Sequence, residues 1–338
     1  MRGGSGISIL ATPEIAADLA FHLGDDPNPT WLHPQAQQYH LGPQDKAGLF
    51  DVREVPGKGK GALATRLIRA GEVVIRESPA ILNIPELPKG VQPSQVGRLF
   101  ELAVQQLPEV QRKGVYELAG GSEDSDVTRG ELINRVLNTN SFGIQVKDHF
   151  LAALCPEIAR INHACRPNMF TRFSYETFTM EAVAYVDIQP GEELSVSYLP
   201  LNLLSEDRKA MVQKWGFNCT CSVCSSPQKA SESDRNKYRI QEVLDQLKDK
   251  SGRNREKVER LANELFSLLE VERLQAQAGS FASLIMGVYI EMGDLEKARE
   301  YAATAMKNQT VYFGHDSDKA KSALEMVELL DTVEVEYA

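Results

Sequence analysis

The sequence predicts an α+β fold, because strand-like and helix-like patterns occupy separate parts of its 338 residues. β-Branched residues and tight turns dominate residues 48–84 and 139–200, whereas apolar residues recur at helical spacing between residues 94 and 138. From residue 231 onward, the pattern is almost wholly helical and contains no cysteine. We therefore expect strands that are interrupted by a helical insertion and followed by an all-helical C-terminal region.

The composition is that of an ordinary globular protein, with 42% apolar and 25% charged residues. A formal net charge of −10 argues against a general nucleic-acid-binding surface, so no direct nucleic-acid binding is expected. No apolar run approaches the roughly 18 residues that a membrane span requires, and the first residues lack the pattern of a signal peptide. We expect a cytoplasmic and/or nuclear monomer that makes no membrane contact.

The first strand-rich part follows a predicted N-terminal arm at residues 1–47, in which Thr12 is expected to cap a short helix. Leu49–Arg53 and Val73–Glu77 are expected to form strands. Glycines recur in the loop Gly57–Gly61 between them, where they permit positive φ and a close approach of the backbone to a neighbour.

Two helices are predicted in the insertion, which spans about residues 86–138. The first follows apolar residues between Val96 and Leu107, and the second runs from Thr128 to Leu137. The apolar residues of the first are Val96, Leu99, Phe100, Ala103 and Leu107, and those expected to face inward in the second are Leu132, Ile133, Val136 and Leu137.

Strands return after the insertion. Phe170–Phe173 and Thr177–Ala182 are expected to flank a turn near Ser174, and Leu194–Tyr198 to form a further strand. In the C-terminal region, one segment has the signature of a tetratricopeptide (TPR) unit, which is a pair of helices joined here by a turn at Gly293–Asp294. Small residues give its second helix a face for close packing, namely Ala298, Ala302 and Ala305.

Cys219, Cys221 and Cys224 form the run C-T-C-S-V-C, and Cys165 offers a fourth thiol far upstream. Thiolates in this number and spacing suit a tetrahedral Zn²⁺ site of the closed, structural kind. Such a site ties two distant segments of the chain together. The fifth cysteine, Cys155, precedes a proline in an apolar stretch and is expected to be a small buried residue. Because four of the five cysteines are assigned to one metal site, we expect a reducing compartment.

Further motifs lie around these cysteines. They are Gly57–Ala64 followed by Arg69–Glu72, Asn140–Phe142, Arg160–Asn168 and Gly191–Tyr198. Together they resemble the SET-domain methyltransferases, and above all the branch of SET- and MYND-domain (SMYD-like) lysine methyltransferases and their fungal relatives. The segment Arg160–Asn168 is the most specific, because it is similar to the family's N-H-S-C-x-P-N signature and differs from it at Ala164.

The resemblance implies a SET β-fold over residues 48–200, with small curved sheets and a knot-like threading that is rare among proteins. It also implies a zinc-binding post-SET segment at 201–226 and a TPR-like helical domain at 227–338. The implied cofactor is S-adenosylmethionine, beside structural Zn²⁺, and the implied partner is a protein substrate with a lysine side chain, such as a histone tail. No cysteine precedes Cys155, so the MYND finger is absent from this sequence.

Individual residues also gain implied roles from the resemblance. Tyr198 takes the position of the catalytic tyrosine, and Phe217 that of an aromatic residue near the adenine. Trp215 is expected to form a wall of the lysine channel. Glu192 and Glu193 are expected to be structural. The residues implied in cofactor binding are Lys58, Gly59, Lys60, Asn140, Asn162, His163, Tyr198 and Phe217, and the implied metal ligands are Cys165, Cys219, Cys221 and Cys224.

The function that we expect is therefore S-adenosylmethionine-dependent N-methylation of a protein lysine. Two alternatives stay open, because a fold does not fix a function. One is a SET-fold protein that carries out a small-molecule transformation in specialised metabolism. The other is a non-enzymatic module that binds a peptide through its helical tail. The presence of Tyr198, Asn162 and His163 favours the enzyme.

Overall fold

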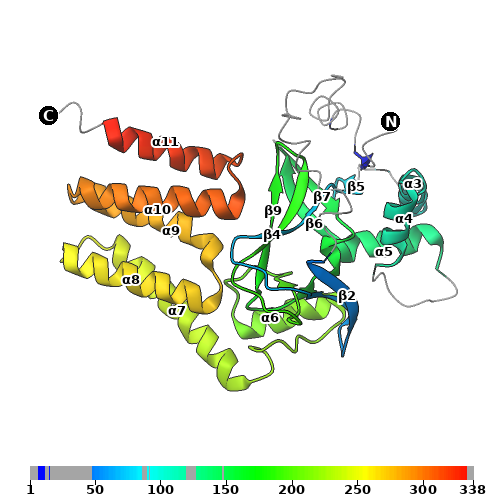
Figure 1. Cartoon of the computed structure of the whole chain (residues 1–338), viewed down its shortest axis with the longest axis horizontal. Helices are drawn as coiled ribbons and strands as arrows, with labels where there is room; N and C mark the ends of the chain where they lie inside the picture. The colour runs from blue at the N-terminus through cyan, green and yellow to red at the C-terminus, as the bar shows by residue number, and fades with distance from the viewer. Residues whose placement is uncertain are drawn as a thin grey trace.

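The computed structural model describes residues 7–11, 15, 48–85, 90, 92–118, 127–146 and 148–332. Figure 1 shows small sheets on one side of the molecule and, on the other, a row of helices formed by the residues after 226. The predicted α+β class is therefore confirmed. The helix expected at Thr12 and most of the expected N-terminal arm lie outside the described residues. No helix in this part of the chain combines the length and apolar character that a membrane span requires.

One sheet has four strands, in the order β1-β5-β7-β6. They are β1 (Ser8–Leu10), β5 (Ile81–Asn83), β7 (His149–Leu154) and β6 (Ser141–Val146). β1 runs parallel to β5, and the other pairs are antiparallel. Alternate residues of β7 face opposite sides, so Leu151 and Ala153 pack in the main β core, whereas Leu154 packs with the helical insertion.

A second sheet has three antiparallel strands, β4 (Val73–Glu77), β10 (Thr179–Ala184) and β9 (Met169–Ser174), with β10 in the centre. Every residue of β10 is buried. The turn between β9 and β10 spans Tyr175–Phe178, later than the predicted turn near Ser174, because Ser174 still pairs with Thr179. Phe178 takes a positive φ of 51° to complete this turn.

Two short ladders complete the β part. β2 (Phe50–Val55) and β3 (Gly59–Ala64) form an antiparallel hairpin, so β3 begins inside the glycine-rich segment that was expected to be a loop. β8 (Asn162–His163) pairs in parallel with β11 (Ser195–Val196). The buried residues of these strands share the main core with those of the two larger sheets, and Ile75, Met169 and Val196 belong to it.

The insertion folds into α3 (Pro93–Gln105), α4 (Glu109–Tyr116) and α5 (Arg129–Asn140). α3 and α5 correspond to the two predicted helices. α4 is not predicted from the sequence because it buries only Val115 and therefore has no apolar stripe. α3 and α5 cross closely, since a Cβ on Gly130 would lie 2.5 Å from the backbone of Gly97.

The predicted apolar faces of the insertion are mostly buried. In α5, Ile133, Val136 and Leu137 are buried, while Leu132 is half-buried. In α3, Leu99 is 46% exposed, although its spacing matches that of the buried residues. Val104 is buried in its place, so the buried face of α3 is rotated from the predicted one.

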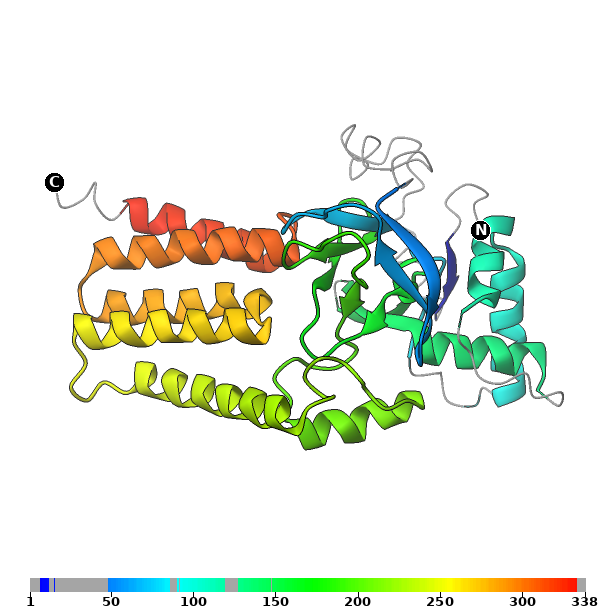
Figure 2. The same cartoon turned by 60° about the horizontal axis from the view of Figure 1, so that its bottom comes forward.

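The helices after the β part are α6 (Ser205–Val212), α7 (Pro227–Lys248), α8 (Arg255–Glu272), α9 (Ala278–Glu291), α10 (Leu295–Phe313) and α11 (Asp318–Thr332). α7 to α11 form the row seen in Figure 2. From α7 onward, each helix packs against the next. The predicted turn joins α9 to α10, where Gly293 takes a positive φ of 74°. The small residues of α10 are buried, as predicted: Ala298, Ala302 and Ala305.

The connection between α10 and α11 contacts the β9–β10 turn. The Asp316 carboxylate accepts hydrogen bonds from Ser174 Oγ (3.0 Å) and from Tyr175 N (2.6 Å). Arg172 donates a hydrogen bond to Val311 O near the end of α10. These contacts fix the far part of the helical region to the second sheet.

A second junction joins the segment after Cys165 to α8. Arg166 forms an ion pair with Glu272, the last residue of α8, and its Nε lies 3.2 Å from Glu272 Oε2. The Glu272 side chain is 1% exposed. Its oxygens also accept hydrogen bonds from Ser233 Oγ (2.6 Å) and Asn236 Nδ2 (2.8 Å) of α7. These donors compensate for the loss of water around a buried carboxylate.

We predict that Arg166→Ala lowers the free energy of unfolding by about 3–5 kcal/mol, because it leaves the buried Glu272 carboxylate without its ion-pair partner. Urea titration of the full chain provides the measurement. The matched control is Arg69→Ala, which breaks the exposed pair with Asp187 and is expected to cost less than about 1 kcal/mol. Equal losses for the two variants would contradict the role of Arg166 at this junction.

Candidate cofactor pocket and metal centre

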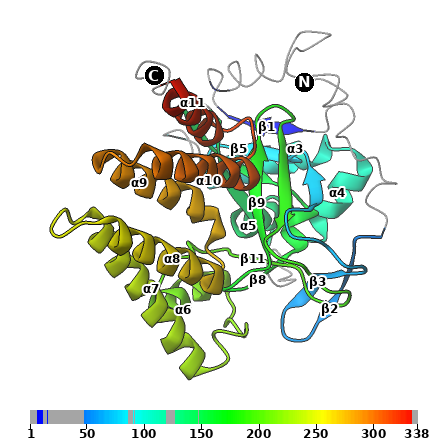
Figure 3. The same cartoon turned by 60° about the vertical axis from the view of Figure 1, so that its left-hand side comes forward.

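The parallel pairing of β8 with β11 brings together two segments that lie far apart in the sequence (Figure 3). Asn162 pairs with Ser195, and His163 pairs with Val196. Tyr198 follows β11 by two residues. Two predicted cofactor residues therefore lie beside the chain that leads into the predicted catalytic tyrosine.

Asn168, whose role is not predicted from the sequence, holds this pairing. Its Oδ1 accepts a hydrogen bond from Ser195 N at 2.8 Å, and its Nδ2 donates to Glu193 O at 2.9 Å. Its amide therefore binds the start of β11 as a neighbouring strand does, with one acceptor and one donor. Asn168 is the last residue of the motif Arg160–Asn168, and this position is the signal in the sequence from which its role could have been predicted. We call its two hydrogen bonds to the start of β11 the Asn168 clamp.

His163 is buried and links the pairing to the cysteine cluster. Its Nδ1 accepts a hydrogen bond from Tyr198 N at 3.1 Å, and its Nε2 lies 3.5 Å from Cys165 Sγ. Burial lowers the pKa of His163 to about 4, so the ring is neutral near pH 7. Because Nδ1 accepts, the proton of the neutral ring is on Nε2 and faces the cysteine sulfur.

Tyr198 is fixed at both of its polar ends. His163 accepts from its amide, and its hydroxyl donates to Ile161 O at 2.9 Å. Burial, together with the negative charge of Glu193, raises the pKa of Tyr198 to about 12. The hydroxyl therefore stays protonated around pH 7 and retains this hydrogen bond.

An aromatic cluster surrounds the Tyr198 ring and consists of His163, Tyr198, Trp215 and Phe217. The ring centroids of His163, Trp215 and Phe217 lie 5.4, 6.3 and 6.4 Å from that of Tyr198. Trp215 ends the short helix η2 (Gln213–Trp215), and Gly216 then takes a positive φ of 79° that turns the chain. Trp215 and Phe217 are half-buried, so the cluster offers an apolar wall that remains open to a ligand.

Glu193 connects the glycine loop to this site. Its carboxylate accepts hydrogen bonds from Lys58 Nζ at 2.6 Å and from Asn162 Nδ2 at 2.9 Å. The Asn162 amide also donates to Lys60 O at 3.3 Å. Lys58, Lys60 and Asn162 are therefore neighbours, and Glu193 has the structural position that the sequence predicts for it.

Gly61, which is not among the predicted site residues, allows this close approach. A Cβ at Gly61 would lie 2.6 Å from Asn162 Nδ2 and 3.1 Å from Glu193 Oε1, so any side chain would displace the amide. Gly61 belongs to the glycine loop Gly57–Gly61, and this run is the signal in the sequence from which its role could have been predicted. The predicted Gly59 takes a positive φ of 69°, a conformation that favours glycine.

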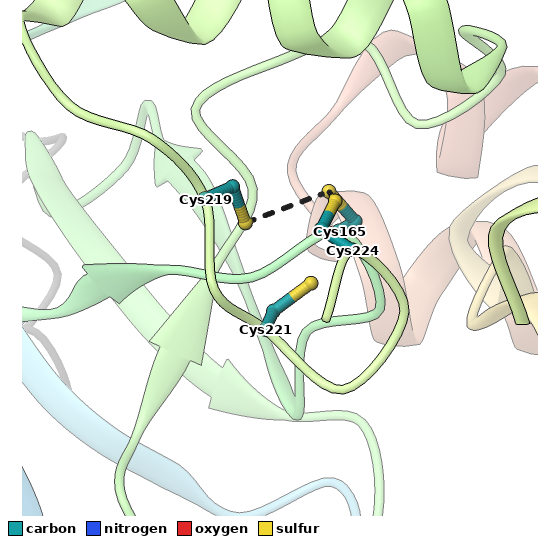
Figure 4. Close-up of side chains that lie close together, drawn as sticks. All are labelled: Cys165, Cys219, Cys221 and Cys224. Carbon is teal, nitrogen blue, oxygen red and sulfur yellow. Dashed lines mark hydrogen bonds between the residues drawn. The ribbon is translucent and has the colours of Figure 1, made fainter. Parts of the chain in front are cut away.

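The four predicted metal ligands come together (Figure 4). The Sγ atoms of Cys165, Cys219, Cys221 and Cys224 all lie within 4.8 Å of one another. Cys165 Sγ lies 3.4 Å from that of Cys224 and 3.9 Å from that of Cys219. A tetrahedral Zn²⁺ ion with Zn–S bonds of about 2.3 Å separates its sulfur ligands by about 3.8 Å. The cluster therefore fits a four-thiolate zinc site.

The fifth cysteine is separate from this cluster. Cys155 is fully buried in the main core, as the sequence predicts. Burial raises the pKa of its thiol, which favours the neutral form. Cys155 therefore acts as a small apolar residue of the core.

Of the residues predicted to bind the cofactor, Asn140 is the one whose contacts indicate such a role least. It ends α5, and its Nδ2 donates to Val136 O at 2.8 Å, one turn earlier in the same helix. In this contact the Asn140 side chain bonds back to its own helix. An approach of Asn140 to a cofactor stays a prediction.

Two buried cations, which are not predicted from the sequence, hold the chain shortly after Tyr198. Arg208 Nη1 and Lys237 Nζ both donate to Leu203 O, at 2.6 and 2.7 Å. Burial lowers the pKa of Lys237 to about 8. These residues belong to α6 and α7, outside the recognisable motifs, and an amphipathic pattern gives no signal for a buried cation.

Comparison with known proteins places this site in a family context. Residues 59–199 match the SET domain family. N-lysine methyltransferase SMYD2-A of Danio rerio is 29% identical over 206 residues, which cover 54% of this chain and 46% of that protein. For N-lysine methyltransferase SMYD2 of Homo sapiens, the identity is 27% over 202 residues, or 52% of this chain and 45% of the relative.

A shorter and more similar match is N-lysine methyltransferase SMYD2 of Gallus gallus, which is 32% identical over 112 residues, or 32% of this chain and 24% of the relative. The chain thus spans less than half the length of each of these relatives. The family match covers both segments of the β8–β11 pairing, the glycine loop from Gly59 and Tyr198. Residues 59–199 therefore match the SET domain family, and the chain is distantly similar to the SMYD2 N-lysine methyltransferases.

Proposed function

We propose that the chain is an S-adenosylmethionine-dependent protein-lysine N-methyltransferase that acts on a histone or a non-histone protein. The observation that carries the proposal is the β8–β11 pairing, which sets Asn162 and His163 beside the segment that leads to Tyr198, whose amide donates to His163 Nδ1. The names of the relatives, N-lysine methyltransferases, support the same activity. The net charge of −10 suits a basic substrate segment.

The residues around the aromatic cluster fit the cofactor. The Phe217 ring offers a flat surface for the adenine, and the His163 ring lies beside it with its centroid at 6.1 Å. Both nitrogens of His163 face other groups of the protein, so the polar side chain that we assign to the cofactor here is that of Asn162. Lys58 and Lys60 offer ammonium groups that suit the carboxylate of the cofactor's methionine part. We assign Gly59 and Asn140 to the same pocket. When bound, S-adenosylmethionine supplies a methyl group activated by its sulfonium.

The protein must present the substrate amine in its neutral form, although the ordinary pKa of a lysine is about 10.4. Trp215 and Tyr198 offer aromatic walls that exclude water and so lower the pKa of an ammonium between them. The Tyr198 proton is donated to Ile161 O, so its oxygen keeps lone pairs that can accept an N–H from the amine. This hydrogen bond orients the nitrogen lone pair for in-line attack.

We assign the metal a structural role. Cys165 lies three residues after Asn162, and Cys219 lies two residues after Phe217. One Zn²⁺ bound by the four thiolates therefore ties two walls of the proposed pocket to each other. Four protein ligands complete a tetrahedral site, so we give the ion no part in the chemical step.

With this function we assign the chain four parts. An N-terminal arm (residues 1–47) precedes the SET domain (48–200), which contains the helical insertion at about 86–138. The post-SET zinc segment (201–226) and the TPR-like helical domain (227–338) follow. Phe217 and the three late cysteines come from the third part, so the pocket needs both the SET domain and the post-SET segment.

We predict that Tyr198→Phe reduces methyl transfer about 100-fold or more, because the amine loses the group that orients it. Transfer of a labelled methyl group to histones, a peptide array and cell extract provides the measurement. Calorimetry is expected to give nearly unchanged affinity for S-adenosylmethionine. The control is Tyr175→Phe, since Tyr175 is 41% exposed in the β9–β10 turn and is expected to retain full activity.

Three outcomes of this pair of assays separate the candidate functions. Cofactor binding with methylation of a protein supports the proposal. Cofactor binding with no methylated protein in any substrate pool would favour a small-molecule substrate, and no cofactor binding would favour a peptide-binding module. Equal turnover by wild type and Tyr198→Phe would overturn the role of Tyr198.

We predict that Cys221→Ser lowers the bound zinc well below one ion per chain and lowers the melting temperature by more than about 4 °C. Elemental analysis and a thermal melt provide the measurements, and cofactor affinity is expected to fall because the Phe217 wall loses its tether. Cys155→Ala is the control, because Cys155 is outside the cluster and its loss leaves all four ligands in place. Full zinc content in Cys221→Ser would rule out this ligand set.

We predict that Gly61→Ala weakens binding of S-adenosylmethionine about tenfold, because the new methyl group displaces the Asn162 amide. Calorimetry measures the change. Gly143→Ala is the matched control: its Cβ would lie 2.7 Å from Phe150 Cζ, but the Phe150 side chain is 58% exposed and can turn away. A similar affinity for both variants and wild type would argue against Asn162 as a cofactor residue.

A further inference from the structure

Two cations, Arg208 of α6 and Lys237 of α7, are buried at the same place in the fold. The Arg208 side chain is 3% exposed, and Lys237 is 9% exposed. Both donate to the backbone oxygen of Leu203, at 2.6 and 2.7 Å, so two positive charges meet at one neutral acceptor. Like charges at such a distance repel each other, and burial removes the water that would weaken the repulsion. The pair therefore needs negative charge close by.

Asp234 supplies only part of this negative charge. Its Oδ1 lies 3.7 Å from Arg208 Nη1, which is too far for a hydrogen bond, and both of its oxygens accept hydrogen bonds from Ser205. Arg208 Nε and Nη2 are buried with no hydrogen-bond partner in the described part of the chain. Among the same residues, Lys237 has no carboxylate within ion-pair distance. The two cations are therefore poorly matched by carboxylates.

Glu272 is the other buried carboxylate of this junction, but it already has a cation. Its ion-pair partner is Arg166. With Arg166 included, the junction holds three cations, namely Arg166, Arg208 and Lys237, and two carboxylates, namely Asp234 and Glu272. One positive charge is therefore left in excess.

The cysteine cluster lies beside this excess of positive charge. Asn236, which precedes Lys237 in α7, donates to Glu272 at 2.8 Å. Glu272 in turn binds Arg166, which follows Cys165 in the sequence. The two cations and the first of the four thiols are thus linked through a single buried carboxylate.

The charges of the cluster and of the two cations act on each other. Burial lowers the pKa of Lys237 to about 8, as does the charge of Arg208, whereas nearby negative charges, among them that of Cys165, oppose this shift. Lys237 therefore carries its proton near pH 7. The charge of Arg208 also acts on His163, whose Nε2 lies 3.5 Å from Cys165 Sγ.

A Zn²⁺ ion bound by four thiolates has negative charge in excess, because the four thiolates outnumber the two positive charges of the ion. We propose that Arg208 and Lys237 are the countercharge of this metal centre and that they strengthen its binding of zinc. In this arrangement, the cations and the metal centre each offset the cost of burying the other. The inference rests on the zinc site assigned above and does not depend on methyl transfer. It gives the two side chains a role beyond their hydrogen bonds to Leu203.

Substitutions at Lys237 separate its charge from its hydrogen bond. Lys237→Gln removes the charge and keeps an N–H group that can donate toward Leu203 O, whereas Lys237→Arg keeps the charge. Competition for Zn²⁺ between the full chain and a chromophoric chelator measures the affinity. Lys237→Gln is expected to bind zinc about tenfold or more weakly than wild type. Lys237→Arg is expected to bind zinc within about threefold of wild type.

Lys248→Gln is the matched control. It makes the same change at an exposed position of α7, about three helical turns from Lys237, and is expected to bind zinc as wild type does. Arg208→Gln removes the other cation and is expected to weaken zinc binding by a similar factor to Lys237→Gln. Because Arg208 is buried, circular dichroism at saturating zinc separates a loss of affinity from a loss of fold.

Each result supports the countercharge or overturns it. Weaker zinc binding by Lys237→Gln, with affinities near wild type for Lys237→Arg and Lys248→Gln, supports it. Equal affinity of Lys237→Gln and wild type would overturn it, and equal losses in Lys237→Gln and Lys237→Arg would assign the effect to packing instead. A wild-type chain that binds no zinc would overturn the metal site and this role together. A chain that binds zinc but transfers no methyl group would overturn the methyltransferase alone.

Discussion

The parallel pairing of β8 with β11 is the constraint on which the rest of the site depends. It joins only two residues of each strand, and so short a ladder is not stable by itself. Side chains therefore reinforce it. Asn168 binds the backbone on one side, and the mutual contacts of His163, Tyr198 and Ile161 hold the other. Because these contacts cross between the two segments, they set the position of Tyr198 relative to Asn162 and His163.

The cysteine cluster orders a segment that has little core of its own. The segment that carries Trp215 and Phe217 continues to Cys224 with no helix or strand after η2, and its small core consists of Cys165, Cys221 and Val223. So few buried apolar groups supply little of the free energy that is needed to order such a segment. In the zinc site that we propose, metal–thiolate bonds supply it without an extensive core, as they do in small zinc domains. The spacing of the sulfur atoms matches that explanation.

The parts of the site that the sequence predicts are those in which the contacting residues share a short motif. Asn162, His163 and Cys165 lie within four positions, and the late cysteines lie within six. The clamp by Asn168 and the Leu203 contacts of Arg208 and Lys237 depend on hydrogen-bond geometry, and no periodicity encodes that geometry. The fold follows the same rule. α5 has a clear apolar stripe and a capping box, so it is predictable, whereas α4 buries a single apolar residue and is not.

The helical region contacts the rest of the molecule at two separate places. α7 and α8 contribute to the site itself, because Lys237 binds the chain after Tyr198 and Glu272 binds the residue after Cys165. The contact of α10 and of the α10–α11 connection with the sheets lies elsewhere, at β9 and the β9–β10 turn, where Arg172 and Asp316 make the hydrogen bonds. α10 and the connection that follows it are thus held to the body of the protein by side chains that are not among those of the proposed pocket. Changes in these contacts and changes around Tyr198 therefore affect different side chains, so the two regions can be mutated independently.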